Sequence, residues 1–79
     1  MDVKQIEKLI KAALPDAEVR VEDPMNDRTH FEALVISPSF QGKNRVQQHQ
    51  MVYRALGGAF EGPLHALSLK TMTPEQAGL

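Results

Sequence analysis

Histidine is the side chain in this sequence best suited to chemistry near neutral pH. The chain contains His30, His49 and His65, together with no cysteine. No two of these histidines lie three or four positions apart, the spacing that would place two imidazoles on one face of a helix. We therefore predict no metal site made by a single helix, and only folding or a partner could bring the histidines together.

The other residue types that carry catalysis form no recognisable pattern. The absence of cysteine excludes a thiol nucleophile, a disulfide framework and a self-contained Cys-ligated zinc or iron–sulfur site. The serines lack a nucleophile elbow, and the Gly42-Lys43 pair lacks the flanking residues of a phosphate-binding loop. We predict that the protein is not an enzyme.

Length and composition describe one domain over residues 1–79. The sequence has 42% hydrophobic and 24% charged residues, with a formal net charge of −1. This charge is not typical of a general nucleic-acid-binding protein, although local basic patches remain an option. The charged N-terminal stretch resembles neither a signal peptide nor a membrane span, so we expect a cytoplasmic protein with no membrane partner.

The hydrophobic pattern of the first half predicts a helix followed by a hairpin. Apolar residues recur with helical spacing over residues 3–14, with Asp2 as the N-cap and Pro15 ending the helix. Residues 17–23 alternate between apolar and polar side chains, and residues 30–36 are rich in branched side chains. Two such strands joined by a short polar loop favour antiparallel pairing.

The second half predicts a long helix, a strand and a short helix. The long helix spans residues 44–60 and could end early at Gly57-Gly58, and a strand follows at residues 64–70. Thr73 and Gln76 match a capping box at the start of a final short helix. The order α-β-β-α-β-α predicts an α+β fold, in which helices cover one face of a three-stranded mixed sheet.

Four segments together resemble the BolA family, in order and over nearly the whole chain. They are Phe40-Gln41-Gly42-Lys43, the stretch VQQHQMVY at 46–53, HALS at 65–68 and TMTPE at 71–75. The resemblance implies a fold similar to the class II K-homology fold. It also implies a role in iron homeostasis, in which the protein shares a bridging 2Fe-2S cluster with a monothiol glutaredoxin of the Cys-Gly-Phe-Ser type and with glutathione.

The resemblance also assigns site residues. The family's strand histidine corresponds to His65, which is the cluster ligand it implies, and His30 is the candidate second ligand because the preceding loop has no cysteine. Partner contacts are expected at Phe40, Gly42, Lys43 and His65. The isolated chain is expected to hold no cluster, and a cluster in the complex is expected to be labile.

Two alternatives remain at the level of sequence. BolA proteins are also described as transcriptional regulators, which would place DNA contacts at Lys43, Arg45 and Arg54. Gln48 and Gln50 replace two arginines of the family's helix signature, which weakens attraction to phosphates. The other alternative is a structural or homodimeric module whose histidines have no ligand.

Overall fold

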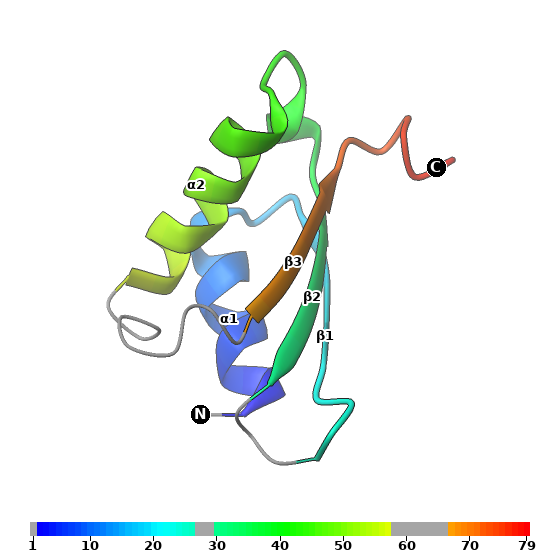
Figure 1. Ribbon diagram of the computed structural model, residues 1–79. Helices are drawn as coiled ribbons and strands as arrows, with labels where there is room; N and C mark the ends of the chain where they lie inside the picture. The colour runs from blue at the N-terminus through cyan, green and yellow to red at the C-terminus, as the bar shows by residue number, and fades with distance from the viewer. Residues whose placement is uncertain (1, 27–29, 58–66) are drawn as a thin grey trace.

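Two helices and three strands are defined in the computed structural model, which describes residues 2–26, 30–57 and 67–79. The elements follow in the order α1 (Val3–Ala13), β1 (Glu18–Glu22), β2 (Phe31–Ile36), the 3-10 helix η1 (Pro38–Phe40), α2 (Arg45–Leu56) and β3 (Leu67–Met72). Both helices lie on the same side of the sheet (Figure 1). This arrangement confirms the predicted α+β fold.

Helix α1 starts where the sequence predicted. The Asp2 carboxylate accepts a hydrogen bond from the Gln5 N–H at 2.9 Å, and the Gln5 side chain accepts one from the Asp2 N–H at 3.0 Å. These bonds satisfy backbone groups that have no partner within the helix. Ile6 and Ile10, one turn apart, are fully buried against the rest of the core, so α1 is held by packing as well as by its cap.

Strand β2 lies at the centre of the sheet. It pairs antiparallel with β1, with Glu18 opposite Ile36, and parallel with β3, with Phe31 opposite Leu67. A parallel pair needs a long crossover connection, and α2 lies within that connection. The predicted hairpin and the predicted mixed sheet are therefore both confirmed.

Helix α2 is shorter than predicted. It begins after Asn44, whose side chain accepts a hydrogen bond from the Gln47 N–H at 2.8 Å, and it ends at Leu56 instead of Phe60. Gly57 follows with φ of +59°. Glycine adopts this conformation without the steric cost that a Cβ would bring, so the first glycine of the pair ends the helix. Neither α1 nor α2 is long and apolar enough to cross a membrane.

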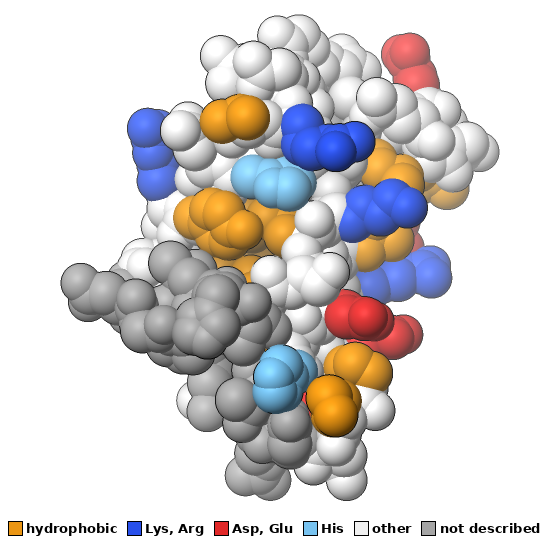
Figure 2. Space-filling model, viewed as in Figure 1, with side chains coloured by type: hydrophobic (Ala, Val, Ile, Leu, Met, Phe, Trp, Pro, Cys, Tyr) orange, Lys and Arg blue, Asp and Glu red, His pale blue; other side chains and the backbone are white. Residues whose placement is uncertain are grey.

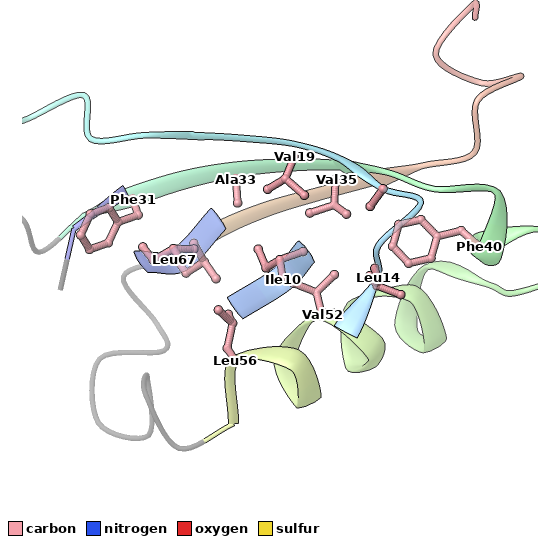
Figure 3. Close-up of a cluster of buried hydrophobic side chains, with 12 residues drawn as sticks. Ile10, Leu14, Val19, Phe31, Ala33, Val35, Phe40, Val52, Leu56 and Leu67 are labelled. Carbon is pink, nitrogen blue, oxygen red and sulfur yellow. The ribbon is translucent and has the colours of Figure 1, made fainter. Parts of the chain in front are cut away.

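The hydrophobic core fills the space between the sheet and the two helices (Figure 3). Alternate residues of β2 point into it, because successive side chains of a strand face opposite sides. The core cluster consists of Ile6, Ile10, Leu14, Ala17, Val19, Phe31, Ala33, Val35, Phe40, Val52, Leu56 and Leu67. One continuous core therefore joins both helices and all three strands.

The prediction of a short C-terminal helix is wrong. The predicted cap forms, since the Gln76 side chain accepts from the Thr73 N–H at 2.9 Å and the Thr73 hydroxyl accepts from the Gln76 N–H at 3.3 Å. The following residues form turns, and Gly78 has φ of +78°. The hydrogen bonds of a cap do not compensate for the free-energy cost of nucleating a helix. The left-handed conformation of Gly78 also leaves no room for a helix to extend after the cap.

Strand β3 extends beyond its predicted C-terminal end. It continues to Met72, two residues beyond the predicted end at Lys70. The first three residues of the predicted strand, 64–66, lie outside the described residues. Leu67 is buried, whereas Ser68 and Lys70 are exposed, as expected for a strand whose alternate side chains face the core.

Candidate functional site

His30 lies at the entrance to the central strand. It immediately precedes Phe31, its side chain is exposed, and it lines a shallow hollow of about 320 Å³. Leu67 and Ser68, the first two residues of β3, line the same hollow. Since Phe31 pairs with Leu67, the parallel pairing brings His30 to the beginning of β3.

His65, the other histidine that the sequence singled out, lies outside the described residues. It stands two positions before Leu67 in the sequence. Among the described residues there is no group of three or more His, Asp or Glu side chains that could hold a metal ion. Within the described part of the chain, His30 is the exposed histidine that lines a hollow with the first residues of β3.

His49 lies in a different hollow from His30. It is on α2, where Arg45 and Lys70 line a hollow of about 480 Å³ with it. The His49 ring also meets the edge of the Tyr53 ring, with centroids 6.3 Å apart. Burial, and then the positive charge of Arg45, lower the pKa of His49 below its ordinary value. The structure thus separates the two described histidines.

The turn at residues 40–43 divides into a buried and an exposed part. Phe40 is fully buried and belongs to the core, so its side chain is not on the surface that a partner would meet, contrary to expectation. Gly42 and Lys43 are exposed, and Gly42 has φ of +77°. Glycine is suited to this left-handed conformation at the tip of the turn.

Gln48 has a structural role that was not predicted from the sequence. Its amide nitrogen donates to the Phe40 and Lys43 carbonyl oxygens at 3.2 and 2.8 Å, and its amide oxygen accepts from the Thr71 hydroxyl at 2.7 Å. The residue is buried. A signal was available, because Gln48 shares the helical spacing of Val52 and Leu56, which face the core.

The three basic residues expected to contact DNA do not form one patch. Arg45 is the first residue of α2 and Arg54 is in its last turn. Nine positions in an α-helix correspond to about 13 Å along the axis and to about half a turn beyond two full turns. Arg54 therefore projects from the opposite side of α2, and Lys70 from β3 is instead the basic residue that shares a hollow with Arg45.

The sequence profile of the BolA-like protein family matches residues 7–76. The chain belongs to the BolA-like family. BolA-like protein 1 of human and of mouse are each 37% identical to this chain over 75 residues. The alignment covers 87% of this chain and 55% of each relative, so the chain spans little more than half the length of these relatives.

Solved BolA structures have the same fold. A bolA protein homologue from Coxiella burnetii superimposes with a TM-score of 0.82 at 36% identity, covering 100% of this chain and 99% of that one. BolA1 from Arabidopsis thaliana gives a TM-score of 0.78 at 31% identity, with 92% of each chain covered. The two-helix, three-stranded architecture of this BolA-like domain is therefore shared with experimentally determined members.

Proposed function

We propose that this BolA-like protein is a non-enzymatic adaptor in iron–sulfur cluster trafficking and iron homeostasis. In this proposal it forms a heterodimer with a monothiol glutaredoxin of the Cys-Gly-Phe-Ser type, and a 2Fe-2S cluster bridges the two proteins. The observation that carries the proposal for this chain is the exposed His30, which directly precedes β2 and lines one hollow with Leu67 and Ser68 at the start of β3.

The topology favours a joint role for the two histidines. Phe31, directly after His30, pairs with Leu67. Each residue adds at most about 3.6 Å of chain, so a residue two positions before Leu67 is within about 7 Å of it along the backbone. We therefore propose that both histidines serve the same cluster.

The chemistry of the donors fits a shared cluster better than a site within one chain. Imidazole nitrogen replaces cysteine as a ligand in some 2Fe-2S centres. The chain has no cysteine, so thiolate ligands would have to come from the glutaredoxin and from glutathione. His30 is exposed, and a partner's cluster could reach it without unfolding of the domain.

Imidazole ligation makes the complex sensitive to acid. A histidine binds metal only as the neutral imidazole, and its reference pKa is about 6.5. We expect cluster loss as the pH falls through this range, because protonation competes with the metal. A cluster spectrum that is unchanged down to about pH 5, well below that reference value, would contradict ligation by histidine.

The test is a visible absorption and circular dichroism titration of a monothiol glutaredoxin that carries its cluster, in the presence of glutathione. Adding this protein should replace the spectrum of the glutaredoxin homodimer with a new one. His65→Ala should abolish the change, and His30→Ala should weaken or alter it. His49→Ala is the matched control, because His49 lies in another hollow. A spectrum that remains that of the glutaredoxin alone would refute the proposal.

A further inference from the structure

We propose that the hollow between α2 and β3 binds a small, doubly charged oxyanion of the phosphate type, held by Arg45, His49 and Lys70. The proposal does not depend on the cluster function, because His30 is not among the described residues that line this hollow. In Figure 2, Lys and Arg side chains (blue) lie close to a histidine (pale blue) on the face that α2 and β3 form.

The charges that line the hollow all have one sign. Arg45 comes from the first turn of α2 and Lys70 from β3, and none of the described residues that line this hollow is Asp or Glu. Two cations supplied by separate elements attract a dianion more strongly than a monoanion, because each contributes its own Coulomb interaction. An arginine fork also matches two oxygens of one tetrahedral anion.

Neutral hydrogen-bond donors complete the lining. Ser68, whose side chain carries a hydroxyl, and Gln76, whose side chain carries an amide, also line the hollow. The amide oxygen of Gln76 accepts a hydrogen bond from the Thr73 N–H at 2.9 Å. This bond fixes the orientation of the amide, and the amide nitrogen is the group that can donate to an anion. The Thr71 hydroxyl donates to Gln48 at 2.7 Å, so Thr71 serves the fold and not the anion.

His49 makes the proposed site pH-dependent. The groups around it are Arg45 and Tyr53 on its own helix, Lys70 from β3 and the neutral Gln76 from the C-terminal turns. Burial and the charge of Arg45 lower the pKa of His49. A bound dianion would offset that charge and favour the imidazolium form, so by linkage the anion should bind more tightly as the pH falls.

The experiment is an NMR titration of the histidine ring resonances with sulfate and, separately, with pyrophosphate. Sulfate stays doubly charged across the histidine range, so its own ionisation does not confuse the pH series. Sodium chloride at the same ionic strength is the control for screening. We expect saturable shifts of the His49 signals, a raised pKa of His49 with sulfate bound, and tighter binding at lower pH.

Variants separate a defined site from diffuse attraction. Arg45→Gln and Lys70→Gln should each weaken sulfate binding by about three- to fivefold, the upper part of the range for an exposed charge pair. Arg54→Gln removes an equal charge from the opposite side of α2 and should leave the affinity unchanged. His49→Gln should retain binding but abolish its pH dependence.

Three results would overturn the proposal. Sulfate and pyrophosphate could shift the His49 signals no more than matched sodium chloride does. Arg54→Gln could weaken binding as much as Arg45→Gln, which would indicate general electrostatic attraction. An oligonucleotide could shift the His49 signals when neither small anion does, which would assign the hollow to a nucleic-acid strand and not to a small ligand.

Discussion

The buried amide of Gln48 should be a main determinant of how the turn at 40–43 is held against α2 and β3. Gln48→Met keeps the length and the helix propensity of the side chain but removes its hydrogen-bonding groups. Three hydrogen bonds are lost, two to carbonyl oxygens and one from the Thr71 hydroxyl. We therefore expect the variant to fold but to unfold more easily.

The size of the effect follows from these contacts. A typical hydrogen bond contributes about 0.5–1.5 kcal/mol net, and a buried polar group left without a partner costs about 1–3 kcal/mol. Gln48 is 6% exposed, so water can satisfy only part of what is lost. We expect Gln48→Met to lower the free energy of unfolding by about 2–3 kcal/mol, a large share of the roughly 4–12 kcal/mol typical of a domain this size.

The assay is urea unfolding followed by far-ultraviolet circular dichroism. Gln50→Met is the matched control, because Gln50 is exposed on the same helix and should change the free energy of unfolding by less than about 0.5 kcal/mol. Thr71→Val should cost about 1 kcal/mol alone and less in the Gln48→Met background, since the two residues share a bond. If Gln48→Met is as stable as Gln50→Met, the assigned role is wrong.

Three further predictions concern caps, backbone and pH, all measured by urea unfolding. Asp2→Ala and Asn44→Ala each remove an N-cap and should cost about 1 kcal/mol; wild-type stability would show that the caps contribute nothing. In Gly57→Ala the added Cβ would meet no atom within 4 Å, but the alanine would have to adopt φ of +59°. We therefore expect the strained backbone alone to lower the free energy of unfolding by about 1–2 kcal/mol. An unchanged free energy of unfolding would mean that the backbone at this position relaxes. The pKa of His49 is lowered in the folded state, so the unfolded chain binds more protons than the folded chain below about pH 6.5. The free energy of unfolding should therefore decrease as the pH falls below this value. An equal decrease in His49→Gln would exclude His49 as the cause.

Local patterns were sufficient to predict most of the framework. The Asp2 cap and the helical spacing before Pro15 located α1, and alternation located β1 beside a branched strand β2. The helix within the second connection indicated the parallel pair. These features depend on interactions between residues close in sequence, or on rules that hold for most connections.

The parts that sequence did not predict depend on contacts between distant segments. Gln48 was interpreted as a lost positive charge, because nothing nearby in the sequence shows that the carbonyls of the turn and the Thr71 hydroxyl surround it. The cap at Thr73 formed as predicted, but a cap does not report whether a helix will continue after it. Phe40 was interpreted as a contact residue although the fold uses it in the core.

At the candidate sites, too, the sequence predicted some features, and others became evident only from the fold. Histidine type and spacing excluded a metal site on one helix, but they could not show that His30 and His49 line separate hollows. That separation follows from the register of Phe31 with Leu67 and from the position of His49 on α2. Lys70 was not singled out, because its proximity to Arg45 arises only when β3 lies alongside α2.

The central proposal is histidine ligation of a shared cluster, and pulsed electron paramagnetic resonance tests it most directly. This protein would carry ¹⁵N-histidine, the glutaredoxin would be unlabelled, and the cluster in the complex would be reduced to a paramagnetic state. We predict strong ¹⁵N hyperfine coupling that is lost in His65→Ala, altered in His30→Ala and unchanged in His49→Ala. A reduced cluster in the complex without ¹⁵N coupling would contradict the proposal.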